Sequence, residues 1–129
     1  MLVLDSSYLV ALFNRADALH EKALEKRLQI PTEENLLLPE YVALELATIL
    51  GIRGDISISS KSLEKLLTAK EVIFVPCSEF FMETLKEFST EKKFALSFVD
   101  CALLVIAKTY EADEILTFDA NLQSAFDST

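Results

Sequence analysis

Glycine and proline are rare in this chain, and their scarcity limits the folds that it can adopt. Only two glycines and three prolines occur among 129 residues. A sheet built from hairpins needs such residues at its turns, because they supply the backbone conformations that tight turns require. The composition therefore favours long helices joined by short loops over an all-β fold.

Short apolar stretches alternate with segments of helical periodicity along the whole chain. The sequence predicts strands at Met1–Leu4, Leu36–Leu38, Val72–Val75 and Ile115–Phe118. It predicts helices at Ser6–Asn14, Asp17–Gln29, Glu40–Leu50, Ser60–Lys70, Ser78–Phe88, Ser97–Tyr110 and Asn121–Phe126. Strands that alternate with helices imply an α/β fold with a parallel sheet covered on both faces.

Size and composition narrow the class of protein further. The length fits one ordinary domain. No run approaches the roughly 18 apolar residues that a membrane span needs, and no export signal is visible. Cys77 and Cys101 are too few for a disulfide framework or a zinc site. We therefore expect buried thiols, no membrane association and a reducing, cytoplasmic location.

The chain is acidic, with a net charge of −9. This charge disfavours a simple nucleic-acid coating protein, which normally presents a basic surface. The negative charge does not exclude an RNA enzyme that acts through bound metal ions.

Six acidic residues have no other charged residue within four positions. Glu40 lies in the first turn of a predicted helix, where a carboxylate complements the helix dipole, and Asp127 lies in the tail of the chain. The other four carboxylates have no such simple explanation. They are Asp5, Glu45, Asp100 and Asp119, and each lies within or at the end of an apolar stretch. Burial of an unpaired carboxylate costs several kcal/mol, so such residues need a partner or a function. The nearby sequence offers them no lysine or arginine.

The order of the elements brings these carboxylates to one edge of the sheet. In a parallel α/β unit the helices run antiparallel to the strands, so a helix begins at the edge where the strands end. Asp100 begins such a helix, whereas Asp5 and Asp119 end strands. Glu45 lies six residues past Pro39, which is roughly 9 Å along the helix that starts there. Open α/β sheets bind ligands at this carboxyl edge.

Clustered carboxylates indicate a metal site. Two carboxylates about 4 Å apart repel by about 4 kcal/mol at an effective dielectric near 20, so several cannot stay ionised together without a cation. Oxygen ligands select hard ions such as Mg²⁺ or Mn²⁺. Such an ion activates water and neutralises charge on a phosphate under in-line attack.

Each carboxylate except Glu45 also has a purely structural interpretation. Asp5 and Asp119 could cap the helices that follow them. Asp100 lies three residues after Ser97, the spacing of a capping box. A buried glutamate in the middle of a helix has no capping role. A purely structural explanation of all four carboxylates together is therefore much less plausible than such an explanation of any one of them.

Five stretches, in this order, resemble the PIN-domain family and, more narrowly, its VapC-type toxin branch. They are LVLDSSYLVALF, ADALHEKA, LELATIL, LSFVDCALLVIAK and ILTFDANL. The resemblance implies that residues 1–129 form a single nuclease domain of α/β/α layers, with a parallel sheet of four to five short strands. It implies a divalent-metal-dependent endoribonuclease that uses Mg²⁺ or Mn²⁺. It also implies RNA as substrate, a cognate antitoxin and a homodimer.

The resemblance also implies roles for individual residues. Asp5, Glu45, Asp100 and Asp119 match the acidic positions, expected to be both catalytic and metal-binding. Polar groups expected to support them are Ser6, Ser97, Thr117 and Asn121. Some relatives carry an acid where this chain has Asn121, which places a second metal ion in doubt. Arg15 is the candidate for RNA contact.

Other functions fit the sequence less well. A phosphotransfer enzyme of the haloacid dehalogenase type would need a second aspartate where the chain has Ser7, and a receiver domain would need paired early acids. Cys101 lies in an apolar helix without a paired base, which argues against a role as a nucleophile. His20 has no evident link to the carboxylate edge, which argues against a role as a general base. The main alternative is a catalytically inactive PIN-like module that binds RNA or protein.

Overall fold

A four-stranded parallel sheet forms the centre of the molecule. The computed structural model describes residues 1–129, and its strands lie in the order β3-β2-β1-β4. They are β1 (Leu2–Leu4), β2 (Leu36–Pro39), β3 (Val72–Val75) and β4 (Glu114–Leu116). The expected parallel sheet is confirmed, with four strands.

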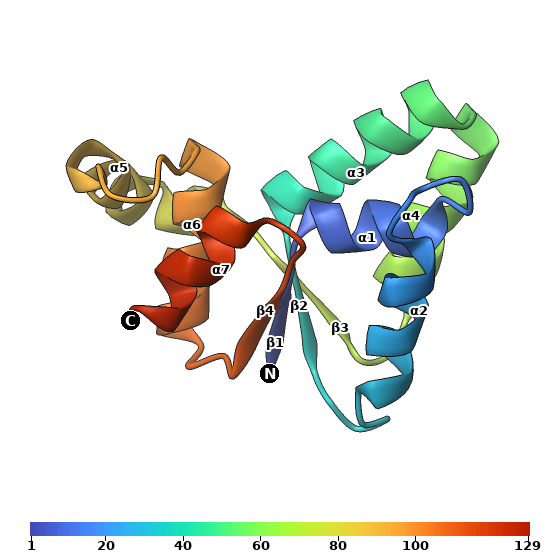
Figure 1. The fold of residues 1–129 in the computed structure, drawn as a ribbon, viewed down its shortest axis with the longest axis horizontal. Helices are drawn as coiled ribbons and strands as arrows, with labels where there is room; N and C mark the ends of the chain where they lie inside the picture. The colour runs from blue at the N-terminus through green and yellow to red at the C-terminus, as the bar shows by residue number, and fades with distance from the viewer.

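Helices cover both faces of this sheet (Figure 1). One side carries α1 (Ser6–Phe13), α2 (His20–Gln29), α3 (Glu40–Arg53) and α4 (Ile56–Thr68). The other side carries α5 (Phe81–Thr90), α6 (Phe98–Thr109) and α7 (Ala120–Asp127), with the 3-10 turn η1 (Ser78–Phe80) before α5. None of these helices is both long enough and apolar enough to cross a membrane. The expected three-layer α/β/α fold is confirmed.

The core lies along the central strands. Val3 of β1 is paired with Leu37 of β2 and with Ile115 of β4, and none of the three is exposed to solvent. Strands buried on both faces need apolar side chains at successive positions, because neither face contacts water. This explains why the central strands β1 and β2 are continuous apolar runs in the sequence.

Two predicted helix boundaries on the α1–α4 side were wrong. The second helix begins at His20 and not at Asp17, because the carboxylate of Asp17 accepts a hydrogen bond from the backbone N–H of Leu19 at 2.8 Å and forms a turn. The third helix continues through Gly51 to Arg53. Gly51 is a half-buried helical residue, and the C-cap of the helix is Gly54, whose backbone N–H donates to the carbonyl of Leu50 at 2.9 Å.

Three further boundaries also differ from the prediction. The fourth helix begins at Ile56, because Asp55 caps it by accepting from the N–H of Ile58 at 2.8 Å. The segment predicted as one helix at 78–88 divides into η1 and α5. The last strand ends at Leu116, two residues before the predicted end, because Thr117 turns toward Asp5.

A candidate metal centre at the carboxyl edge of the sheet

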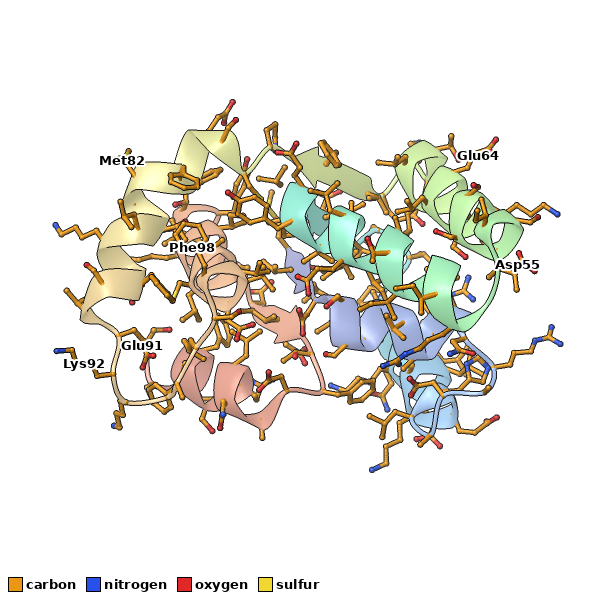
Figure 2. All side chains as sticks on the ribbon, turned by 90° about the horizontal axis from the view of Figure 1, so that it is seen from above. Asp55, Glu64, Met82, Glu91, Lys92 and Phe98 are labelled. Atoms are coloured by element: carbon orange, nitrogen blue, oxygen red, sulfur yellow. The ribbon has the colours of Figure 1, made fainter.

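Two acidic residues lie where the order of the strands reverses. Strand β1 has β2 on one side and β4 on the other. The chain leaves β1 toward α1 on one side of the sheet and leaves β4 toward α7 on the other, which is the arrangement that forms a crevice at the carboxyl ends of neighbouring strands. Asp5 follows β1 directly, and its backbone N–H donates to the carbonyl of Leu116 at 3.1 Å. Asp119 follows β4 after a short extension. Figure 2 looks down on this edge, with the start of α6 marked by Phe98.

Asp5 is almost fully buried and is held by two hydroxyl groups. Its side chain is 5% exposed. The hydroxyl of Thr117 donates to Oδ2 at 2.7 Å, and that of Ser7 donates to the same oxygen at 2.8 Å. The other oxygen, Oδ1, accepts no hydrogen bond from the protein. The two hydroxyls therefore fix the carboxylate while leaving one oxygen free for a ligand.

The same hydroxyls connect the beginning of α1 to the end of β4. Ser7 Oγ accepts from the backbone N–H of Phe118 at 2.9 Å, and Thr117 Oγ1 accepts from that of Asp119 at 2.9 Å. The two hydroxyl oxygens lie 3.2 Å apart. This network positions Asp5 and Asp119 relative to each other.

Ser7 is the functional residue that the sequence interpretation missed. The resemblance directed attention to Ser6, next to Asp5, but the hydroxyl that donates to Asp5 belongs to Ser7. Ser6 instead faces Glu45, where it partly opposes the rise in the pKa of Glu45 that burial causes. A serine two residues after an aspartate is well placed for a local hydrogen bond between the side chains at a helix start, and that spacing was the available signal.

Glu45 extends from the middle of α3 into the same region. Its Oε1 atom is buried and accepts no hydrogen bond. Burial raises the pKa of Glu45, and the charges of Asp5 and Asp100 raise it further. A buried oxygen without a donor is costly. Glu45 is therefore the carboxylate with the least structural explanation.

Asp100 combines a capping role with an electrostatic one. Its backbone N–H donates to Ser97 Oγ at 3.0 Å, and its Oδ2 accepts from the Ser97 N–H at 3.2 Å. The capping box is thus present. Burial nevertheless raises the pKa of Asp100, with smaller contributions from Asp119 and Asp5 and an opposing effect from Ser97. The cap accounts for one oxygen of Asp100.

Asp119 is the N-cap of α7. Its Oδ1 accepts from the backbone N–H of Asn121 at 2.9 Å and from that of Leu122 at 3.2 Å. The capping interpretation holds for Asp119, which still has Oδ2 without a protein donor. For Asp5 it is wrong, because Asp5 occupies the N-cap position of α1 without making a side-chain cap hydrogen bond.

The donor set fits a hard divalent cation. All four side chains offer only oxygen atoms, one of them buried without a partner, and the charges of the carboxylates raise the pKa values of Glu45 and Asp100. In the structure no three acidic, histidine or cysteine side chains come close enough together to form a ready ligand group. An ion bound by all four carboxylates would draw them closer to one another.

The remaining candidates lie outside this group. Asn121 is exposed and contributes its backbone N–H to the cap of α7. Arg15 is exposed in the loop after α1. His20 Nδ1 lies 2.7 Å from the carbonyl oxygen of Ala11 and so links two helices. Cys101 is fully buried, and burial raises the pKa of its thiol to about 11, which rules against a nucleophilic role.

The sheet order, the helices on both faces and the acidic carboxyl edge define a small α/β protein with a candidate cation site. Comparison with known families identifies it more closely. Residues 2–126 match the PIN domain family, and the chain belongs to that family.

A solved structure gives the same fold. The crystal structure of VapC20 from Mycobacterium tuberculosis, described as a sarcin-ricin loop cleaving toxin, superposes with a TM-score of 0.87 and 17% sequence identity. The match covers 97% of this chain and 95% of VapC20. Among curated proteins, none matches the sequence. At this identity the likeness to VapC20 shows a shared fold.

Proposed function

We propose that this protein is an endoribonuclease of the VapC toxin type, which hydrolyses RNA phosphodiester bonds with Mg²⁺ or Mn²⁺. Membership of the PIN domain family and the fold shared with VapC20 support this proposal. The observation that carries it is the buried Oε1 of Glu45, which has no protein donor and lies in the field of two other carboxylates.

Four carboxylates would hold the ion in this proposal. Asp5 offers Oδ1, because Ser7 and Thr117 occupy Oδ2, and Asp119 offers Oδ2, because the α7 cap occupies Oδ1. Glu45 and Asp100 complete the set. A bound Mg²⁺ or Mn²⁺ would supply activation of a water molecule and neutralisation of charge on the phosphate.

The protonation states of Glu45 and Asp100 determine the pH range in which the site can bind a metal ion. The pKa values of Glu45 and Asp100 are raised, so both carboxyl groups lose their protons at a higher pH than ordinary carboxyl groups do. Metal ligands must be deprotonated. Activity should therefore decline as the pH falls through these raised values. Ser7, Thr117 and Ser97 keep the ligands oriented throughout.

The partners follow from the same proposal. We infer a cognate antitoxin that blocks the carboxyl edge, a homodimer, and residues 1–129 as one nuclease domain. Both cysteines are free and buried, which agrees with a reducing cytoplasm. Arg15, an exposed cation, stays the candidate for RNA contact beyond the acidic edge.

Cleavage of end-labelled RNA tests the proposal. Single-stranded and hairpin RNA would be incubated with the wild type and Asp100→Asn, in Mg²⁺, in Mn²⁺ and in EDTA. We expect cleavage by the wild type with either ion, none in EDTA, and a loss of more than about 100-fold in the variant. Circular dichroism would verify that the variant is folded.

Two outcomes would contradict the proposal. Equal cleavage by both proteins would indicate a contaminating nuclease. Binding of RNA without cleavage under every metal condition would establish the inactive RNA-binding module as the function.

A further inference from the structure

The loop between α5 and α6 contains a residue with a strained backbone. Helix α5 ends at Thr90, and α6 begins at Phe98. Between them, Ala95 has a φ angle of 54°, which lies in the left-handed region that residues other than glycine rarely adopt. Such a conformation persists only where the surrounding contacts hold it. Hydrogen bonds on either side of Ala95 supply that restraint.

Glu91 makes these hydrogen bonds with both oxygens of its carboxylate. Oε1 accepts from the backbone N–H of Phe94 at 2.6 Å, and Oε2 accepts from that of Leu96 at 3.0 Å. The two donors flank Ala95 in the sequence. The same hydrogen bonds lower the pKa of Glu91, because they stabilise the ionised form. Glu91 therefore clamps the loop on both sides of its strained residue.

The place of Glu91 in the chain indicates that its side chain serves the loop and not α5. Glu91 is the C-cap of α5, where the helix dipole disfavours a negative charge. The last turn of α5 has no basic residue to offset that charge. Figure 2 shows Glu91 beside the loop that runs to Phe98 at the start of α6. The stabilising contacts of the carboxylate are therefore those with the loop.

The clamped loop leads directly into the candidate metal centre. Leu96 is 7% exposed and packs in a small cluster with Cys101 of α6 and Ala125 of α7. The next residue, Ser97, is the N-cap of α6, and its backbone N–H donates to Oδ2 of Asp100 at 3.2 Å. The loop therefore sets where α6 begins and, with it, where the Asp100 carboxylate lies.

We propose that Glu91 is a positioning residue of the metal centre, which holds Ala95 in its left-handed conformation and so keeps Asp100 in place near Asp119. Glu91 acts through the backbone of the loop and contacts no metal ion itself. This role rests on the proposed function, because it concerns a ligand of the same ion.

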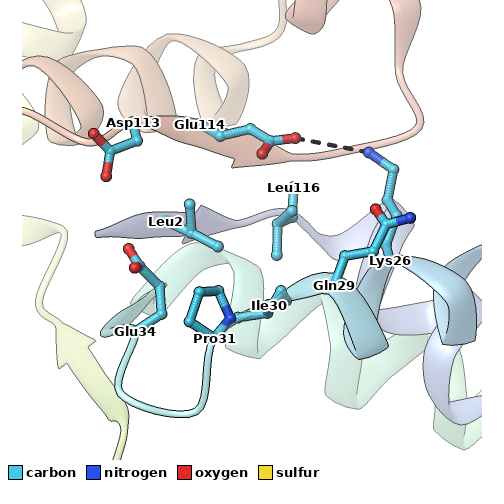
Figure 3. A pocket seen from close by; sticks show the side chains of 9 residues that line it. All are labelled: Leu2, Lys26, Gln29, Ile30, Pro31, Glu34, Asp113, Glu114 and Leu116. Atoms are coloured by element: carbon cyan, nitrogen blue, oxygen red, sulfur yellow. Dashed lines mark ion pairs between the residues drawn. The ribbon is translucent and has the colours of Figure 1, made fainter.

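A matched control lies at the opposite edge of the sheet. Glu114 begins β4 at the amino edge and lines a small cavity there (Figure 3). Its Oε1 atom lies 3.8 Å from Nζ of Lys26, and no backbone N–H donates to its carboxylate. Glu114→Gln therefore removes the same charge as Glu91→Gln and leaves the loop between α5 and α6 unchanged.

Titration with Mn²⁺, followed by the electron paramagnetic resonance signal of the free ion, tests the positioning role. Glutamine has one acceptor oxygen where glutamate has two, so Glu91→Gln cannot hold both N–H groups. The variant should bind Mn²⁺ at least about tenfold more weakly than the wild type. Glycine adopts the left-handed conformation without restraint, so addition of Ala95→Gly should restore most of the lost affinity. Glu114→Gln should bind Mn²⁺ like the wild type.

Glu91→Asp separates geometry from charge. Aspartate keeps both oxygens and the negative charge, but its side chain is one carbon shorter and does not reach both N–H groups. Glu91→Asp should therefore also weaken Mn²⁺ binding, and Ala95→Gly should again restore it. Ala95→Gly alone should bind Mn²⁺ like the wild type. Circular dichroism would verify that each variant is folded.

Three results would overturn the positioning role. If Glu91→Gln binds Mn²⁺ as tightly as the wild type, Glu91 only closes the end of α5. If the affinity stays low after Ala95→Gly is added, Glu91 acts through its charge and not through the loop. Both results leave the metal centre of the proposed function intact. If the wild type itself binds no Mn²⁺, the metal centre and the role of Glu91 fail together.

Discussion

Glu45 is half-buried, and one of its two carboxylate oxygens, Oε1, is buried without a hydrogen bond. Its neighbours in space are other carboxylates, which raise its pKa in addition to the effect of burial. Such an arrangement destabilises the folded protein when no cation is present. A bound cation would offset the repulsion between Glu45 and the neighbouring carboxylates.

Substitution of Glu45 tests this strain through its pH dependence. Because the folded-state pKa of Glu45 is raised above its ordinary value of 4.5, its contribution to stability is fully present below that value and is lost as the pH rises through the folded-state pKa. In EDTA, Glu45→Gln should therefore gain stability relative to the wild type as the pH rises from 4 to 7. Urea unfolding at a series of pH values measures the difference.

Glu64→Gln, at an exposed position on α4, is the matched control and should show no such trend. A difference between Glu45→Gln and the wild type that stays constant over the same range would contradict the electrostatic interpretation of Glu45.

Isolation from other charges, together with the expected order of the strands and helices, selected Asp5, Glu45, Asp100 and Asp119 as candidate ligands from the sequence. Their function as ligands stays a prediction. Ser7 could not be selected in the same way, because serine is common and the sequence does not show which hydroxyl of the Ser6–Ser7 pair turns back toward Asp5. That choice depends on how α1 begins against β4, a tertiary contact between residues 111 positions apart.

Helix termini supply most of the groups at the acidic edge, so structural and chemical roles overlap at the scale of the element. Asp100 belongs to the capping box of α6, and Asp119 is the N-cap of α7. Carboxylates at helix N-termini are stabilised by the backbone N–H groups and the helix dipole. The edge can therefore hold several acids before any metal binds.

Two substitutions of Asp119 separate its roles. Asparagine is also a good N-cap, so Asp119→Asn should change the free energy of unfolding by less than about 0.5 kcal/mol while RNA cleavage is lost. Asp119→Ala removes the cap as well and should cost about 1 kcal/mol. Thermal unfolding and cleavage assays on both variants measure this. Retention of activity in Asp119→Asn would show that the residue is only a cap.

Ser7 connects α1 to the extension after β4, and its removal should loosen both. Ser7→Ala leaves the N–H of Phe118 without an acceptor and Asp5 without one donor, which should cost about 1–3 kcal/mol. Urea unfolding measures the loss, with the exposed Ser60→Ala as control. Equal stability of the two variants would mean that the Ser7 hydrogen bonds contribute little.

Most of the architecture could be predicted from the sequence, because strands buried on both faces leave a continuous apolar run and amphipathic helices leave a periodic one. The ends of elements were less predictable. Asp17 and Asp55 both make local hydrogen bonds to the backbone, yet one forms a turn before a helix and the other begins a helix. Of the two glycines near the end of α3, Gly51 continues the helix and Gly54 is its C-cap, and the sequence does not show which of the two ends it.

The net charge of −9 acts at the scale of the whole molecule. An acidic body repels RNA, so affinity for a polyanion has to come from bound cations or from local basic groups. In the proposed function, a divalent ion bound at the acidic edge would reduce this repulsion and stabilise the folded state at the same time. Metal binding should therefore be visible in the stability of the entire protein.

The most direct test of the candidate metal centre is thermal unfolding of the wild type and Asp100→Asn, with and without Mn²⁺. At about 100 times its dissociation constant, Mn²⁺ should stabilise the wild type by about 2.7 kcal/mol, which raises the midpoint by several degrees. The variant should respond much less and should be at least as stable as the wild type in EDTA. If millimolar Mn²⁺ leaves both midpoints unchanged, the four carboxylates do not form a metal centre.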